Sequence, residues 1–209
     1  MTANRNLRNQ YFILRHGEAV SNIKKIASSW LEKFYNPLTL KGKEEIKKAA
    51  EKLKKQKINF IFSSDILRTK QTAEIIAKEI GIKKIFFDKR LREINCGILN
   101  NKSIEQVAKF WSEKEIMPSR HYLKRFQIAP PRGETYFETE KRIFDFLKEI
   151  DKKYQGKNIL IVSHSRPLTL LEKAIYGYTL KKFVKIIMEK KEIKTGEARK
   201  LLKHETKTL

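Results

Sequence analysis

The sequence predicts an α/β fold in which a mostly parallel central sheet carries helices on both faces, as a three-layer sandwich. Short apolar runs, rich in aromatic and β-branched residues, predict buried strands at 11–14, 58–62, 85–87 and 158–162. Between these runs apolar residues recur at helical spacing, and alternation of strands with helices is typical of parallel sheets. The 209 residues contain no Gly-, Ser- or Pro-rich linker, so we predict one domain over 1–209 with its core at about 10–190.

The first predicted strand ends abruptly on Arg15, His16 and Gly17, where the glycine lets the backbone turn. In open α/β sheets ligands bind beyond the carboxyl ends of the strands, which makes Arg15 and His16 candidates for a site. The alternative is a strand-end histidine beside a surface arginine. The segment that follows, 21–36, is predicted as a loop or short helix whose aromatic residues floor a pocket or fill an edge of the core.

A capped helix and a second strand follow in the chain. Thr39 is expected to cap a helix through Lys55, and the strand at 58–62 leads through Ser63-Ser64-Asp65 into a helix that Gly81 ends. Arg68 lies in the first turn of that helix, where a cation opposes the macrodipole. A bound anion shared with the free N–H groups would explain the arginine, although an exposed arginine is the alternative.

The middle of the chain places one acid in a basic, partly apolar loop. Glu93 follows the strand at 85–87, Asn101 suits a left-handed turn, and Ser103 is expected to cap a helix through Trp111. The helical pattern then fades over 113–132, which includes His121 and Arg125. We predict either a mobile lid or an ordinary surface excursion there.

A second strand delivers a second histidine. An amphipathic helix is expected to begin at Gly133-Glu134-Thr135, and the strand at 158–162 ends near His164. Ser165 and Pro167 then suit the N-cap and first turn of a helix through Tyr176. The region 180–188 reads as helical or irregular cover, and the last dozen residues as a basic, weakly ordered tail. Two strands that each end at a histidine would bring both histidines to one edge of the sheet. Core packing explains such a coincidence less readily than a shared functional site does.

Composition narrows the classes of function. There are 47 Lys and Arg residues against 24 Asp and Glu, a formal net charge of +23, which attracts phosphorylated or polyanionic partners. Nucleic acid is a possible but not favoured partner, because the lysines sit at helix-surface periodicity. Cys96 is the only cysteine, and the four histidines show no metal-ligand spacing. Without a membrane-length apolar run or an apolar signal-peptide core, the protein is expected to be cytoplasmic, and its oligomeric state is open.

Taken together, the motifs resemble the histidine phosphatase superfamily, which includes the cofactor-dependent phosphoglycerate mutases. The matching features, in order, are Arg15-His16-Gly17 with Asn22, Arg68 in Ser-Ser-x-x-x-Arg-x-x-x-Thr-Ala, Glu93 before Gly97, Pro131-x-Gly133-Glu134, and His164 after an apolar strand. The match runs from about Tyr11 to Tyr176. It implies a phosphoglycerate mutase-like fold and a small phosphorylated substrate.

The resemblance implies that His16 is the nucleophile. It would be transiently phosphorylated on a ring nitrogen, and water would then release the phosphate. Arg15 and Arg68 would bind the phosphoryl oxygens, and His164 would donate a hydrogen bond at the start of the following helix. Glu93 would act as general acid and base.

The remaining candidates are of two kinds. Asn22 and Ser165 are expected to add phosphate contacts, and Arg166 and Arg125 to touch substrate. Because arginines supply the positive charge, we expect no metal and no cofactor.

The departures from the family pattern rank the activities. Mutases of the family usually follow the acid with an Arg-His-Tyr-Gly type of sequence, whereas Glu93 leads into Ile-Asn-Cys-Gly, closer to the phosphatase branch. We therefore rank a metal-independent phosphomonoester hydrolase above a phosphoglycerate mutase. A basic polyanion-binding module on the same fold is the third hypothesis.

Overall fold

A five-stranded sheet lies at the centre of the computed structural model, which describes residues 7–30, 32, 34–112 and 122–201. In chain order its strands are β1 (Gln10–Arg15), β2 (Phe60–Ser63), β3 (Ile85–Phe87), β4 (Asn158–Ser163) and β5 (Ala198–Leu201). The order across the sheet is β3-β2-β4-β1-β5, and only β5 runs antiparallel to its neighbour. The predicted mostly parallel sheet is confirmed.

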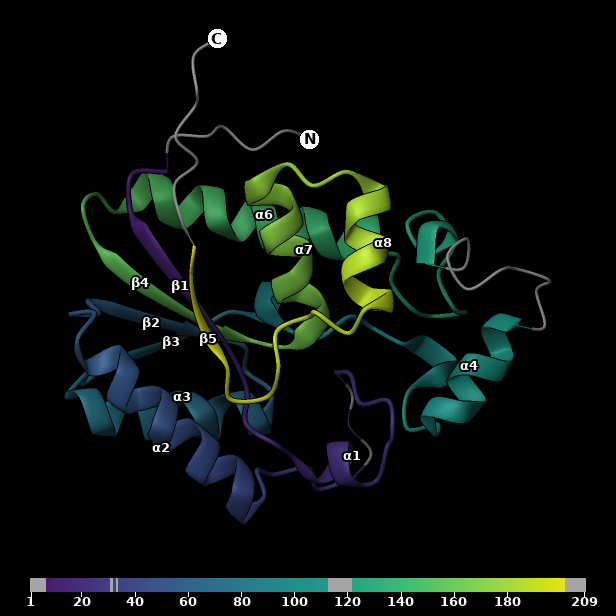
Figure 1. Ribbon diagram of the computed structural model, residues 1–209, viewed down its shortest axis with the longest axis horizontal. Coiled ribbons are helices and arrows are strands. Elements are labelled where there is room, and N and C mark those ends of the chain that lie inside the picture. The colour runs from purple at the N-terminus through teal and green to yellow at the C-terminus, as the bar shows by residue number, and fades with distance from the viewer. Residues whose placement is uncertain (1–6, 31, 33, 113–121, 202–209) are drawn as a thin grey trace, which may run out of the picture.

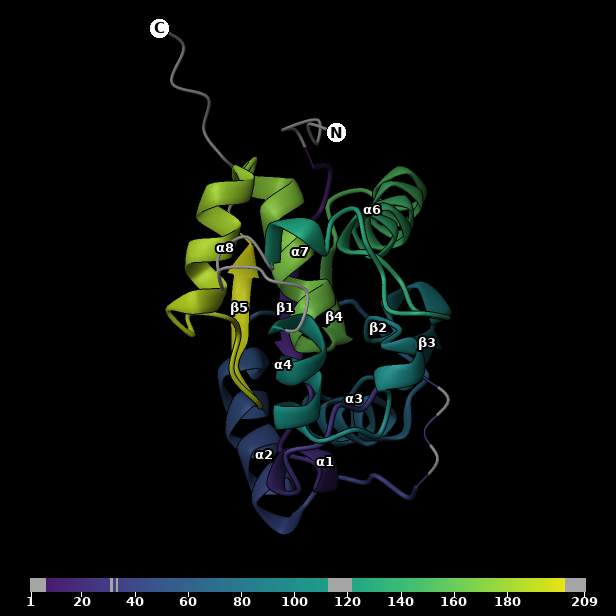
Figure 2. The same cartoon turned by 90° about the vertical axis from the view of Figure 1, so that its right-hand side faces the viewer.

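Helices cover both faces of the sheet (Figure 1, Figure 2). The α-helices of the described residues are α1 (Val20–Ile23), α2 (Leu40–Lys54), α3 (Leu67–Ile80), α4 (Ile104–Ser112), α6 (Tyr136–Lys153), α7 (Ser165–Tyr176) and α8 (Leu180–Met188). Helices α2 and α3 pack on one face, and α6 and α7 on the other. In the described part of the chain no helix is both long and apolar enough to cross a bilayer.

The three layers follow from the order of the strands. From β1 the chain moves outward to β2 and β3, and it then returns to place β4 between β1 and β2. Because crossovers between parallel strands are right-handed, reversing the direction moves the connecting helix to the opposite face. Helices α2 and α3 connect the outward steps and α6 the return, so the sheet is covered on both sides.

Alternation along each strand divides the core between these layers. Phe12 and Leu14 of β1 pack in the cluster that contains α2 and α3, whereas Tyr11 and Ile13 pack with α6 and α7. All four side chains are buried. Burying a large apolar side chain stabilises the fold by about 1.5–3 kcal/mol. Packing on both faces therefore holds the central strands in place, and with them the residues at the strand ends.

Several predicted helix ends are confirmed. Thr39 Oγ1 accepts a hydrogen bond from Gly42 N at 2.9 Å at the start of α2. Thr135 forms a capping box with Glu138, and Ser103 accepts from the Gln106 backbone. Gly81 ends α3 with φ of 79°.

Three expectations about element boundaries are wrong. β2 begins at Phe60 rather than residue 58, because pairing with β4 starts only at Phe60, opposite Ile159. The N-cap of α7 is His164, since the helix begins directly after β4 with Ser165 as its first residue.

The third correction concerns the predicted tail. The last dozen residues include β5, which pairs with β1, and Leu201 is 2 % exposed. Ile193, beyond the predicted core, is fully buried. Backbone pairing at a sheet edge orders this segment despite its basic composition, and residues 202–209 lie outside the described part.

Candidate active site

The two predicted histidines meet at the carboxyl ends of β1 and β4, on the side of the sheet where α1 and α4 lie (Figure 1). The register pairs Arg15 with Ser163, so each histidine is the next residue of its own strand. The rings of His16 and His164 lie 5.2 Å apart between centroids, at 64°. Both side chains are buried, which excludes a histidine at the protein surface.

Hydrogen bonds fix the tautomer of His16. Its Nδ1 lies 2.8 Å from Gly17 O, and Arg68 Nε donates to its Nε2 at 3.1 Å. A carbonyl oxygen only accepts and an arginine nitrogen only donates, so the proton lies on Nδ1 and the lone pair on Nε2. Burial, then Arg68 and Arg15, hold the pKa of His16 well below 6.5. The ring is therefore neutral, with its basic nitrogen directed at a cation.

Gly17 matters through packing rather than through an unusual backbone angle. A Cβ on Gly17 would lie 2.4 Å from Gly42 O, and one on Gly42 would lie 2.0 Å from Glu18 O. The first turn of α2 thus rests directly on the loop that carries His16. Sequence analysis missed the role of Gly42. The available signal was a glycine in the first turn of a helix, where the lack of a side chain allows such a close approach.

Arg68 is 2 % exposed, so the exposed alternative is wrong. Besides His16 Nε2, its guanidinium donates to Ser28 O at 3.1 Å and to Ser28 Oγ at 3.3 Å, and it forms an ion pair with Glu32. All three of its nitrogens contact protein acceptors.

Arg15 is held by the C-terminal segment. Its Nη1 donates to Ile193 O at 3.0 Å, and Gly196 N donates to His16 O at 3.2 Å. The segment between α8 and β5 therefore positions both residues at the end of β1. This contact could not be expected from a stretch that resembles a tail in composition.

His164 lies at the N-terminus of α7 and completes the pocket. Its Nε2 lies 3.0 Å from Ser64 Oγ, at the end of β2. Among the described residues, its Nδ1 has no hydrogen-bond partner. Burial, followed by Arg68 and His16, keeps the pKa of His164 well below 6.5. Ser64 Oγ is already hydrogen-bonded to this ring, whereas the first backbone N–H groups of α7 have no partner within the helix and can donate to a ligand.

Glu93 sits in a loop that other side chains brace. Its own carboxylate accepts from Ile94 N at 3.0 Å, and burial raises its pKa although Arg68 opposes the shift. Arg142 donates to Glu93 O at 3.1 Å and forms an ion pair with Glu134 at 3.0 Å. The acid of the Pro-x-Gly-Glu motif therefore positions the predicted acid–base residue.

The other predicted contacts have partners of their own. Asn22 is exposed, and its side-chain oxygen accepts from Ala19 N at 2.8 Å. Ser165 Oγ donates to Glu192 at 3.1 Å, and Arg166 pairs with the same carboxylate at 3.0 Å.

Arg125 stacks on aromatic rings. Its guanidinium lies 4.5 Å from the centroid of Tyr136 and 5.2 Å from that of Trp111. Of the predicted lid, residues 113–121, with His121, lie outside the described part. Phe126, within the described part, packs against Tyr136 and Phe183 with centroids 5.3 Å apart in each case.

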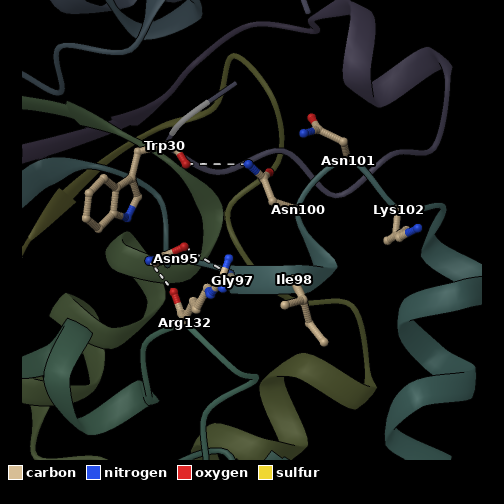
Figure 3. Close-up of a pocket in the computed structure, with 8 residues that line it drawn as sticks. All are labelled: Trp30, Asn95, Gly97, Ile98, Asn100, Asn101, Lys102 and Arg132. Atoms are coloured by element: carbon tan, nitrogen blue, oxygen red, sulfur yellow. Dashed lines mark hydrogen bonds between the residues drawn. The ribbon is translucent and has the colours of Figure 1, made fainter. Parts of the chain in front are cut away.

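A cavity of about 560 Å³ adjoins the Glu93 loop (Figure 3). Its lining consists of Trp30, Asn95, Gly97, Ile98, Asn100, Asn101, Lys102 and Arg132. Trp30 thus lines a pocket, one of the two roles expected for the aromatic segment. Asn95 shapes the wall by accepting from Gly97 N and donating to Arg132 O, both at 2.9 Å. Asn101 takes the predicted left-handed turn, with φ of 65°.

Fold and pocket together define the phosphoglycerate mutase-like class of α/β proteins, with two buried histidines at the strand ends and two arginines, Arg15 at the end of β1 and Arg68 in the first turn of α3. The chain belongs to the histidine phosphatase superfamily (branch 1), whose family model matches residues 11–198. It is accordingly an enzyme of that superfamily, a phosphatase or a mutase.

Named relatives fall on both sides of that division. The chain is 33% identical to "Probable phosphoglycerate mutase GpmB" of Escherichia coli over 168 residues, which cover 80% of this chain and 75% of the relative. A mycobacterial glucosyl-3-phosphoglycerate phosphatase, solved with VO3, superposes with a TM-score of 0.79 at 20% identity, covering 92% of each chain. YhfR of Bacillus stearothermophilus gives a TM-score of 0.69 at 25% identity, covering 84% of this chain and 83% of that one.

Proposed function

We propose that the protein is a metal-independent phosphomonoester hydrolase that works through a phosphohistidine on His16. The observation that carries the proposal is the unprotonated Nε2 of a buried, neutral imidazole beside the Arg68 guanidinium. A nucleophile needs an unprotonated nitrogen, and a histidine near neutral pH has one reliably only when its pKa is low. Burial and two arginines provide that condition. Arg68 Nε donates to this nitrogen at 3.1 Å, and that hydrogen bond must give way when Nε2 attacks phosphorus.

The reaction begins when the phosphoryl group of the substrate enters between the two arginines. Nε2 of His16 attacks phosphorus, the bond to the leaving oxygen breaks, and the group transfers to the ring. Charge on the phosphoryl oxygens is stabilised by Arg15 and Arg68 and by hydrogen-bond donors already in place. The unpartnered Nδ1 of His164 and the start of α7 are such donors when that nitrogen is protonated.

Glu93 is the group proposed to protonate the leaving oxygen and then to take a proton from the attacking water. Its raised pKa favours the protonated form needed in the first step. Arg68, Arg166 and Arg15 act in the opposite direction and favour the carboxylate needed in the second. This residue therefore has an environment suited to both roles.

Hydrolysis is ranked above mutase activity because of the sequence after Glu93, which reads Ile-Asn-Cys-Gly. The name of the 33% identical Escherichia coli relative favours phosphoglycerate mutase as the second candidate. A mutase must hold its phosphohistidine until a second phosphoglycerate arrives, whereas a phosphatase must admit water. The two therefore differ in the fate of one intermediate.

The test compares the wild-type protein with His16→Ala on an aryl phosphate, with EDTA present. Loss of the nucleophile should reduce kcat by at least about 10³-fold. Rapid quenching with ³²P-labelled substrate should trap an acid-labile phosphoprotein in the wild type only. Full activity in His16→Ala would overturn the proposal.

A second assay separates hydrolase from mutase. Phosphoglycerate is supplied with a bisphosphoglycerate primer, and isomerisation and release of inorganic phosphate are measured together. The proposal expects phosphate release to dominate. Isomerisation much faster than release would establish the mutase instead.

A further inference from the structure

A carboxylate lies against the guanidinium proposed to bind phosphate. Glu32, 15 % exposed, forms an ion pair with Arg68 Nη1. The same carboxylate oxygen accepts from Ser28 Oγ at 2.5 Å and from Asn36 Nδ2 at 2.6 Å. Sequence analysis assigned no role to Glu32, which lies in the segment predicted as a loop or short helix with aromatic residues.

The carboxylate is held from the protein side as well as by Arg68. Asn36 is 1 % exposed, and its side-chain oxygen accepts from Ser21 N at 2.8 Å while its amide donates to Glu32. Ser28 Oγ donates to the same carboxylate oxygen. The negative charge is therefore anchored, and it does not depend on the arginine alone for its position.

A single guanidinium connects this charge to the nucleophile. Arg68 Nε contacts His16 Nε2 at 3.1 Å, while Nη1 of the same group contacts Glu32. A phosphoryl group on His16 must share Arg68 with the carboxylate. Two anions that share one cation in a site screened from water weaken each other's binding.

We propose that Glu32 is a specificity-determining residue that competes with substrate anions for Arg68. This inference rests on the proposed function, with His16 as the site of phosphoryl transfer. Glu32 lowers the affinity of the pocket for inorganic phosphate, and it disfavours substrates that carry a carboxylate or second phosphate beside the scissile group. The preferred substrates are phosphomonoesters whose leaving groups are uncharged.

Glu32→Gln tests the proposal because glutamine keeps the shape and an accepting oxygen but removes the charge. The inhibition constant of inorganic phosphate should fall about tenfold, the size of one charge-assisted hydrogen bond. The kcat/KM for 3-phosphoglycerate should rise at least about tenfold more than that for 4-nitrophenyl phosphate. Glu32→Ala, which also removes the hydrogen bonds, should change both in the same direction.

Glu140→Gln is the matched control. Its carboxylate is 14 % exposed and pairs with Lys173 at 2.7 Å, a burial and a pairing like those of Glu32. Lys173 lies in the last turn of α7, away from the histidines. Both constants should stay at wild-type values in this variant.

An unchanged or weaker phosphate affinity in Glu32→Gln would overturn the proposal, because the carboxylate would then only position Arg68. Failure of the proposed function has a different signature, namely no His16-dependent turnover in the wild type. Calorimetric titration with inorganic phosphate, which needs no turnover, would then still measure the effect of the charge. Tighter binding in Glu32→Gln supports the competition, and equal or weaker binding rejects it.

Discussion

The two histidines and the two acids of the pocket are held in different ways. His16 and His164 continue adjoining parallel strands, and the strand register sets their separation. Glu93 and Glu32 lie on irregular segments, and side-chain hydrogen bonds set their positions. The nucleophile thus shares the stability of the central sheet, whereas each acid depends on a few polar contacts.

A small change in the chain can therefore move an acid of the site more easily than a histidine. Moving a histidine would require a shift of β1 against β4, which would also move the buried side chains of both faces of the sheet. Moving an acid requires the loss of one or two hydrogen bonds. We therefore expect the acids to determine which substrates react, and the histidines whether any do.

The largest effect on the loop side is expected for Glu93→Gln. Without a proton donor, an alkyl phosphate should react about 10²-fold more slowly or worse, because its leaving oxygen is a strong base. Phenolate from 4-nitrophenyl phosphate leaves without help, so this substrate should lose less than about tenfold. The measurement is kcat/KM for both substrates in the wild type and the variant, because this constant excludes the later attack of water on the phosphohistidine, a step that both substrates share.

An equal loss of kcat/KM on both substrates would contradict the role of Glu93 as proton donor to the leaving oxygen. The residue would then act on the phosphoryl group itself rather than on the leaving oxygen. Glu140→Gln again serves as the control, since its ion pair with Lys173 lies elsewhere.

Glu134→Gln leaves Glu93 in place but removes the brace, which is the ion pair between Arg142 and Glu134 that supports the Glu93 loop. Arg142 and Glu134 are 17 % and 18 % exposed, and Glu134→Gln leaves that guanidinium without its charged partner. We expect the free energy of unfolding to fall by about 2 kcal/mol, the size of hydrogen bonds between charged groups. Because the brace holds Glu93, alkyl phosphates should again lose more activity than aryl phosphates.

Urea denaturation measures the change in stability. Glu44→Gln is the control, since its pair with Lys47 is about half exposed on both sides and should change stability by less than about 0.5 kcal/mol. A Glu134→Gln protein as stable as this control would show that the brace is dispensable.

The same contrast explains how much of the molecule the sequence could predict. The signals for strands and helix caps are local, so Thr39 and Gly81 were predicted correctly as helix ends, and the start of α6 was predicted to within a few residues. Arg15, His16 and His164 could be placed at one edge because parallel strands end on the same side of a sheet. The distance of 5.2 Å between the ring centroids of His16 and His164 could not be predicted, because strand register depends on pairing between distant segments.

The sequence does not reveal contacts between irregular segments, because these segments lack the periodic patterns of helices and strands. Ile193 holds Arg15 through a backbone carbonyl, which any residue could supply. Glu32 reaches Arg68 from a loop 36 residues away, and nothing in its neighbours indicates this pairing. Hydrogen bonds between loops have no periodicity, so composition alone made the C-terminal segment resemble a tail.

The smallest predicted effect concerns the histidine side and its dependence on pH. The pKa of His164 in the folded protein lies well below its ordinary value of 6.5, so above pH 6.5 the residue is neutral in both states. As the pH falls below 6.5, the unfolded chain binds a proton that the folded protein excludes, and stability is lost. Between pH 7.5 and pH 5.5 this loss is about 1 kcal/mol for one histidine.

His164→Gln isolates that contribution, because the amide can still contact Ser64 but does not titrate. The unfolding free energy from urea titrations should fall between the two pH values by about 1 kcal/mol more in the wild type than in the variant. His16 titrates in both proteins, so its contribution cancels in the difference. Equal losses would mean that folded His164 takes up a proton as easily as the unfolded chain, and a protonated ring beside Arg68 would contradict the neutral histidine pocket.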